Sequence, residues 1–311
     1  MKARALVWIE LHWNKILNSE THRMIIIEKI SDMWAGVDSF ERSLGLVPTM
    51  GFLHQGHRSL LKLAREQNRT LMASLFVNPK QFGPSEDFEK YPRNWNTDIE
   101  VFEQEGVDVL FVPSNNEMYP STFSTYIDVG DIGRQLEGSH RPDHFSGVAT
   151  VVCKLLNICK PDRAYFGQKD AQQCAVVKKF CEDLNLETQI VTSPTVRDHD
   201  GLALSSRNIY LSPVERDAAL LMNKALEEAR RMWICGERDS VKLCVAIEQI
   251  LTSNSLIKID YVTLVDSSTF QDSNVASEGS LIAIAARIGS ARLIDNVILN
   301  FTPSVQSTKG I

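Results

Sequence analysis

The sequence predicts an α/β protein in which a Rossmann-like parallel sheet domain is followed by a smaller α+β domain. From Met24 onward, short apolar segments alternate with amphipathic segments of helical length, the pattern of parallel strands joined by helical crossovers. One apolar segment leads through glycines into a His-x-Gly-His turn that opens a helix. After about residue 195 the alternation stops, and helical segments precede three strand-like segments, which indicates a second domain.

The elements of the first domain follow from apolar periodicity and from the residues that end each segment. The expected strands are rich in apolar residues and are bounded by Pro, Gly or Asn: Leu44–Val47, Leu71–Val77, Val107–Val112, Arg163–Phe166 and Thr188–Val191. The expected helices between them carry apolar residues at helical spacing: His57–Gln67, Asp98–Gln104, Val148–Ile158 and Ala171–Leu184.

The second domain is expected to begin near Pro194–Val196. A helix should open at Ser212, because Ser can cap, Pro213 fits the first turn and Glu215 can close a capping box. The remaining expected elements are a helix over Ser240–Leu251 and strands at Ile257–Leu264, Ser280–Ile288 and Ala291–Ile298. The predicted organisation is therefore an extension at 1–23, domains at 24–195 and 196–303, and a loose tail at 304–311.

Composition excludes several classes of function. The 311 residues carry a net charge of -6 and a pI near 5.7, which argues against a surface that binds nucleic acid. No apolar run reaches the roughly 18 residues of a membrane span, so no membrane partner is expected. The six cysteines form no Cys-x-x-Cys pair and suit reduced thiols packed in the core of a cytoplasmic protein.

The first 23 residues mix Trp8, Trp13 and acidic residues with basic ones, which fits neither a signal peptide nor a transit peptide. We expect an extension ahead of a natural start at Met24. Deleting Met1–Arg23 should leave activity and thermal stability nearly unchanged.

The stretch from Val47 to His57 has the features of a phosphate-binding turn. A helix N-terminus after a strand offers unpaired N–H groups and the positive end of the helix dipole. Gly56 allows a nucleotide to approach closely, and His54 and His57, three residues apart, can both donate to phosphate oxygens. A structural role is the alternative for a single histidine, but two histidines around a glycine favour phosphate binding. The G-x-x-x-x-G-K-[ST] and G-x-G-x-x-G motifs are both absent from the sequence.

This turn resembles that of the nucleotidylyltransferase superfamily, whose second signature has a counterpart in Leu204–Asn208; by itself that segment could be an ordinary polar loop. Six linked stretches, in order and at matching spacings between about Met24 and Asn300, resemble the pantothenate synthetase family. They are Pro48–Gly51, Phe76–Gly83, Tyr91–Arg93, Arg141–Phe145, Phe166–Asp170 and Asp200–Asn208.

The resemblance implies an ATP-dependent ligase that joins (R)-pantoate to β-alanine through a pantoyl-adenylate, with Mg²⁺, and that forms a homodimer. It implies ATP contacts from Met50, Gly51, Phe52, Leu53, His54, Gln55, Gly56, His57, Gly167, Gln168, Lys169, Asp170, Val196, Leu204, Ser205, Ser206 and Arg207. Gln81 and Gln173 resemble the pair that holds pantoate. Arg141 is a candidate for the β-alanine carboxylate, with a surface arginine as the alternative, and Asp98 is a candidate Mg²⁺ contact.

The expected catalytic residues are His54, His57 and Lys169, which stabilise phosphate oxygens, and Ser205, Ser206 and Arg207, which steady the pyrophosphate. Phe76, Val148 and Val152 could form an apolar wall for pantoate, and core packing is the alternative for them. The sequence departs from the common family pattern at Ala171, Leu204 and Asp198. These changes are expected to alter the shape of the pocket and to leave the activity intact.

Three other functions remain to be weighed against this one. Another adenylyl- or cytidylyltransferase would share the His-x-Gly-His turn, but it would not need Gln81 and Gln173. A tRNA synthetase is disfavoured by the acidic chain and by the absence of an evident RNA-binding appendage. A degenerate nucleotide-binding regulator should have lost His57, Lys169 or the Ser-Ser-Arg segment, and all of these are present.

Overall fold

The computed structural model describes residues 24–84 and 86–301, which form two compact units. The first unit contains the chain up to Val129 together with Arg141–Phe166 and Val177–Thr192. The second contains Gly130–His140, Gly167–Val176 and the chain from Ser193 onward. The sequence predicted one boundary near residue 195, whereas the second unit also takes in two earlier segments. The extension at 1–23 and the tail at 304–311 fall outside the described residues.

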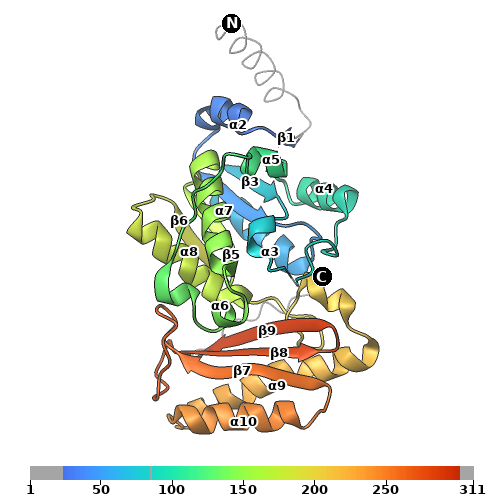
Figure 1. The fold of residues 1–311 in the computed structure, drawn as a ribbon, viewed down its shortest axis with the longest axis vertical. Helices are drawn as coiled ribbons and strands as arrows, with labels where there is room; N and C mark the ends of the chain where they lie inside the picture. The colour runs from blue at the N-terminus through green and yellow to red at the C-terminus, as the bar shows by residue number, and fades with distance from the viewer. Residues whose placement is uncertain (1–23, 85, 302–311) are drawn as a thin grey trace, which may run out of the picture. The chain divides into compact units, whose positions relative to one another are not determined.

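A six-stranded sheet with the order β1-β4-β3-β2-β5-β6 forms the centre of the first unit (Figure 1). The strands are β1 (Ile25–Ile27), β2 (Leu44–Thr49), β3 (Thr70–Leu75), β4 (Val109–Phe111), β5 (Arg163–Gly167) and β6 (Gln189–Ser193). Strand β2 pairs in parallel with both β3 and β5, and β4 pairs in parallel with β1 and β3. The predicted Rossmann-like sheet is confirmed.

Alternate residues of these strands serve the two faces of the sheet. Val47 in β2 and Leu71 and Ala73 in β3 pack in one core against Leu61 of α3 (Gln55–Gln67) and Phe102 of α4 (Trp95–Gln104). Residues at the intervening positions, such as Leu46 and its pair Met72, point to the opposite face, and both of these are fully buried. Both faces of the sheet are therefore covered, as the continuous apolar runs of a parallel sheet require.

The helices of the first unit lie between the strands, as predicted, although some start earlier than expected. They are α2 (Ile30–Gly36), α3 (Gln55–Gln67), α4 (Trp95–Gln104), α5 (Asn115–Met118), α7 (His144–Cys159) and the second part of α8 (Ala171–Asp183), with short 3-10 helices η1 (Val37–Ser39) and η2 (Pro79–Gln81). Strand β1 and helix α2 were not predicted. Three residues of strand are too few to show a period, and β1 is stabilised by a non-local partner, β4.

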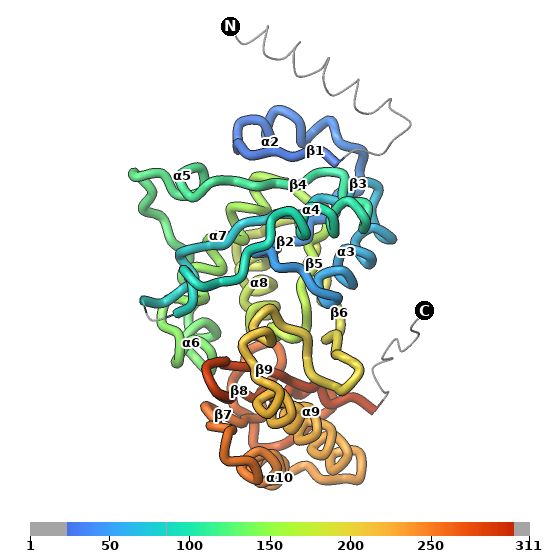
Figure 2. Tube along the Cα trace, turned by 90° about the vertical axis from the view of Figure 1, so that its right-hand side faces the viewer, coloured from blue at the N-terminus to red at the C-terminus, as the bar shows by residue number. Residues whose placement is uncertain are grey.

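The second unit is built on an antiparallel sheet, β7 (Ile257–Val265), β8 (Leu281–Ile288) and β9 (Ala291–Ile298), with β8 in the middle. Helices α9 (Pro213–Ile234) and α10 (Ser240–Thr252) lie along one face of it (Figure 2). Trp233, 1% exposed, belongs to the core between these helices and the strands. The predicted capping box at the start of α9 is present, because Ser212 and Glu215 each accept the backbone N–H of the other.

An ion-pair network on the second unit's sheet anchors the short helix α6 (Glu137–His140), which follows η3 (Gly130–Gly133). Arg292 of β9 donates to both oxygens of Glu137 at 2.5 and 2.7 Å and to Asp260 of β7 at 2.6 Å. The Tyr261 hydroxyl donates to Glu137 at 2.9 Å. Glu137 is only 6% exposed, so its charge is stabilised by these partners and not by water.

All six cysteines are free thiols, and Cys159, Cys174 and Cys181 are buried whereas Cys235 is exposed. Burial raises the pKa of the Cys159 thiol to about 12, which keeps it protonated. No helix within 24–84 or 86–301 is both long and apolar enough to cross a membrane.

Replacing Glu137 with Ala should lower the free energy of unfolding by about 3 kcal/mol, because Arg292 would stay buried with only Asp260 as a partner. Chemical denaturation would measure the change. Arg134→Ala, which removes an exposed ion pair with Asp131, is the matched control and should cost less than about 1 kcal/mol. Equal losses in the two variants would show that the network does not anchor α6.

Candidate active site

The His-x-Gly-His turn lies where β2 leads into α3, and the side chains of the two histidines cap the N-terminus of this helix. Nδ1 of His54 accepts the backbone N–H of Gly56 at 3.1 Å. Nδ1 of His57 accepts the backbone N–H of His54 at 3.2 Å. The two rings lie 4.1 Å apart between centroids. The pair therefore forms a capping box made of imidazoles, which satisfies N–H groups that a helix start leaves without intrahelical partners.

These bonds determine which nitrogen of each ring carries the proton. A backbone N–H can only donate, so Nδ1 of both His54 and His57 must be an unprotonated acceptor. Each ring is then neutral and bears its proton on Nε2. Two imidazoles with Nε2–H donors thus lie at the positive end of the α3 dipole, where anions such as phosphate are stabilised.

The loop before the capping box is held by Asp98 of α4. Its two oxygens accept the backbone N–H groups of Phe52 and Leu53, each at 2.8 Å, and the residue is 3% exposed. Gly51 and Phe52 both adopt left-handed backbone angles, with φ of +84° and 52°. A side chain at Gly51 would also collide with Asp98 and Leu75, so glycine is required there. The role of Asp98 as a Mg²⁺ contact stays a prediction; the bonds that the structure gives it are to backbone N–H groups.

Gln81, at the end of η2, lies beside the turn. Its Nε2 is 3.2 Å from the sulfur of Met50, and its Oε1 accepts from Nδ2 of Asn78 at 3.0 Å. The orientation of the Asn78 amide is set by the carbonyl of Gly147, which only accepts, and by the N–H of Lys80, which only donates. Gln81 is thereby oriented with its N–H₂ group toward Met50. The structure thus brings together two residues that the sequence assigned to pantoate and ATP.

Arg141 forms a fork-to-fork ion pair with Glu86, at 2.8 and 2.6 Å. It also contacts Nε2 of His144 at 3.0 Å, while Nδ1 of that ring donates to the carbonyl of Gln81 at 2.8 Å. Arg141 therefore supports the segment that carries Gln81. Its role toward the β-alanine carboxylate stays a prediction.

In the second unit, Gly167–Asp170 leaves β5 and forms the 3-10 helix η4 (Gln168–Asp170) before α8 begins. The amine of Lys169 lies 3.5 Å from a carboxylate oxygen of Asp170, and its side chain is 19% exposed. Gln172, which precedes Gln173, donates to the carbonyls of Ile132 and Gln135 and so fixes the start of α8. Gln173 is partly buried.

The predicted phosphate loop, also in the second unit, follows a short hairpin. Arg197 pairs with Ala203 across it, and the N–H of Leu204 donates to the carbonyl of Val196 at 3.0 Å. Ser205 then caps η5 (Ser206–Tyr210) by accepting the N–H of Arg207 at 3.3 Å. Leu204–Arg207 therefore forms a turn that is held by hydrogen bonds from backbone N–H groups. Its contact with phosphates stays a prediction.

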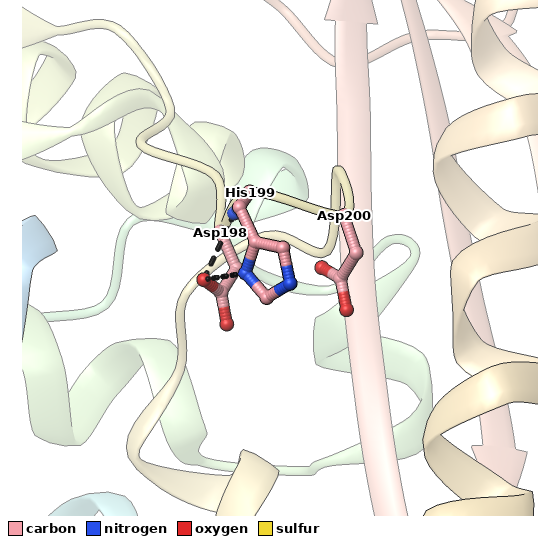
Figure 3. Close-up of side chains that lie close together, drawn as sticks. All are labelled: Asp198, His199 and Asp200. Carbon is pink, nitrogen blue, oxygen red and sulfur yellow. Dashed lines mark hydrogen bonds and ion pairs between the residues drawn. The ribbon is translucent and has the colours of Figure 1, made fainter. Parts of the chain in front are cut away.

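The tip of the hairpin carries Asp198, His199 and Asp200, whose side chains lie close together (Figure 3). Hydrogen bonds from the ring and backbone N–H of His199, assisted by Arg216, lower the pKa of Asp198. Arg216 of α9 donates to Asp198 at 2.6 Å and to Asp200 at 2.7 Å. Because both carboxylates already accept from the same guanidinium, which occupies the space between them, this cluster does not fit a divalent cation.

Three residues that orient Gln81 and Arg141 were not predicted from the sequence: Asn78, His144 and Glu86. Asn78 and His144 lie inside motifs on which the family resemblance was based, so these motifs could have identified both as candidate site residues. Phe76, Val148 and Val152 are 7%, 2% and 4% exposed, which accords with core packing as much as with a pocket wall.

A parallel sheet whose strand runs into a helix capped by His-x-Gly-His defines a nucleotide-binding α/β protein. The family model for pantoate-beta-alanine ligase matches residues 25–298. The pantothenate synthetase of Heliobacterium modesticaldum is 50% identical over 279 residues, covering 89% of this chain and 99% of the relative. The chain therefore belongs to the pantoate-beta-alanine ligase family.

Two crystal structures have the same fold. The pantothenate synthetase of Thermus thermophilus is 40% identical, with a TM-score of 0.85 over 89% of this chain and 100% of that one. The pantoate-beta-alanine ligase of Francisella tularensis, complexed with beta-gamma ATP and beta-alanine, is 35% identical, with a TM-score of 0.74 over 91% of this chain and 100% of that one.

Asp98→Ala should lower the free energy of unfolding by about 2 kcal/mol, because two backbone N–H groups lose their acceptor. Asp98→Asn should cost less, since its remaining oxygen can accept one of them. Thermal unfolding of both variants would be compared with Glu100→Ala, an exposed acid on the same helix. If Asp98→Ala were as stable as Glu100→Ala, the carboxylate would not hold the loop.

Proposed function

We propose that this chain condenses pantoate with β-alanine at the expense of ATP, giving pantothenate, AMP and pyrophosphate. The observation that carries the proposal is the turn at the start of α3. Two neutral imidazoles with Nε2–H donors stand at a helix N-terminus, and the Gln81 amide lies against Met50 of the same turn. The first step of this reaction needs hydrogen-bond donors for the phosphate oxygens and an amide that can bind the hydroxyl groups of a hydroxy acid.

In the first step an oxygen of the pantoate carboxylate attacks the α-phosphorus of ATP, and the bond to the bridging oxygen of pyrophosphate breaks. A carboxylate with an ordinary pKa near 4 is already ionised at neutral pH, so the step requires no base. The chain's contribution is to position the reactants and to stabilise charge on the phosphate oxygens. We assign this role to His54, His57 and Lys169, and that of steadying the pyrophosphate to Ser205, Ser206 and Arg207.

In the second step the free amine of β-alanine attacks the acyl carbon of the pantoyl-adenylate. The carbon–oxygen bond to the phosphate breaks, AMP leaves, and the amine releases one proton. AMP leaves as a stable anion, so little acid–base assistance is required. Protection of the adenylate from water matters more, because hydrolysis would waste ATP.

We propose that Mg²⁺ enters with ATP and is bound mainly by phosphate oxygens and water. Its preference for oxygen ligands and retained water is consistent with this mode of binding. Within the described residues, the one cluster of acidic and histidine side chains with suitable spacing already has both its carboxylates bound to Arg216. The cytoplasmic location and the homodimer implied by the resemblance stay predictions.

The reaction can be tested by measuring AMP formation from ATP with pantoate and β-alanine, each omitted in turn. AMP should require both substrates, whereas exchange of pyrophosphate into ATP should require pantoate alone. Exchange that proceeds without pantoate would favour another nucleotidylyltransferase. A chain that binds ATP but catalyses neither reaction would favour the regulator.

His57→Ala and Lys169→Ala should each lower the rate of adenylate formation by roughly 10²- to 10³-fold, the scale seen when one preorganised donor is removed. Pantoate-dependent pyrophosphate exchange measures this rate, and calorimetry should show a smaller loss of ATP binding. His140→Ala and Lys179→Ala are matched controls, because both residues are exposed and lie outside the predicted site. Rates near the wild type for both site variants would refute the assigned mechanism.

A further inference from the structure

Strand β9 carries two buried polar residues at adjacent positions, Asp295 and Asn296, which are 4% and 6% exposed. Adjacent residues of a strand point to opposite faces of the sheet. Asp295 shares its face with Leu293, which packs in the core formed with α9 and α10. Asn296 shares the other face with Arg292. Buried polar groups are costly unless they are hydrogen-bonded, so their partners indicate what each residue does.

Asn296 binds the backbone of η4. Its Nδ2 donates to the carbonyls of Gln168 at 3.0 Å and Lys169 at 2.9 Å. Its Oδ1 accepts from Nε2 of Gln168 at 3.1 Å. Because carbonyls only accept, the two N–H bonds of the amide are committed to this segment. Asn296 therefore sets the backbone position from which the Lys169 side chain extends.

Asp295 binds the hairpin that precedes the phosphate loop. Its two oxygens accept from Nη1 of Arg197 at 2.6 Å and from Nη2 at 3.0 Å, a fork-to-fork geometry. The side chain of Asp295 is 3% exposed and that of Arg197 is 14% exposed, so water screens the pair little. Arg197 also donates to the carbonyl of Gly201, which ties the two arms of the hairpin together.

We infer that Asp295 and Asn296 are positioning residues for the adenylation step. At adjacent positions on one strand, they hold the backbone of Lys169 and the hairpin that leads into Ser205–Arg207, and both Lys169 and Ser205–Arg207 are assigned to ATP. The distance between these segments is then set by a strand paired along its length with β8. Fixing both segments on one rigid element preorganises their charges before ATP arrives, which is what electrostatic stabilisation requires. This inference rests on the proposed function, which assigns both segments to ATP.

The test compares substitutions of nearly equal shape in the full chain. Asn296→Asp places an oxygen where the amide donated, opposite two carbonyls. Asp295→Asn loses the charge and one of the two acceptors that hold Arg197. Each should lower kcat/KM for ATP by about ten- to hundredfold, with KM for pantoate changed less than about threefold. Pantoate-dependent pyrophosphate exchange would give these constants.

Two variants of the same unit serve as controls. Asn254→Asp makes the same chemical change where the oxygen that accepts from Leu256 is retained. Asp239→Ala removes the cap of α10 and so destabilises the unit without touching either segment. Both controls should keep the wild-type KM for ATP, although Asp239→Ala should melt at a lower temperature.

A positioning role is overturned if Asn296→Asp and Asp295→Asn keep wild-type constants, or if Asp239→Ala loses as much activity as they do. Calorimetric titration with ATP separates this question from the proposed function. Should the wild type bind ATP without pantoate-dependent exchange, the proposed function fails and no adenylation step remains to be positioned; weaker ATP binding by the two variants would then still show that Asp295 and Asn296 position the segments that bind ATP. A wild type that binds no ATP would defeat both.

Discussion

The buried carboxylate of Asp98 is the contact on which the geometry of the first unit's site depends. Between β2 and α3 the chain passes through two left-handed residues, Gly51 and Phe52, a course that backbone preferences alone would not favour. Asp98 compensates by accepting the N–H groups of Phe52 and Leu53. The capping box of His54 and His57 follows directly, so one acid on α4 determines where both imidazoles stand.

In the second unit, side chains of the sheet likewise fix the positions of neighbouring segments. Arg292 and Asn296 lie on one face of β9 and bind α6 and η4, and Asp295 on the opposite face binds the hairpin through Arg197. Short segments are thus located by side chains of a longer, regularly paired strand. Sites supported by rigid elements in this way are more precise than sites built on loops alone.

Much of this could be predicted from the sequence, because the relevant signals are local. Periodicity predicted most of the strands and helices, and Ser212 with Glu215 predicted the start of α9. The partners that orient the site are not local: Asp98 lies 46 residues from Phe52, and Arg141 lies 55 residues from Glu86. A carboxylate in a sequence can be a metal ligand, an ion-pair partner or a cap. Only the folded chain shows which of these it contacts.

The protonation of the two histidines bears on how this turn responds to salt. Both rings use Nδ1 as an acceptor and are therefore neutral. The turn would thus bind a phosphate through N–H groups and the helix dipole, without a formal positive charge. Added ions screen attraction between full charges far more than they weaken short hydrogen bonds. In the proposed site, the part of the ATP affinity assigned to His54 and His57 should therefore vary little with ionic strength, whereas the part assigned to Lys169 and Arg207 should fall as salt is added.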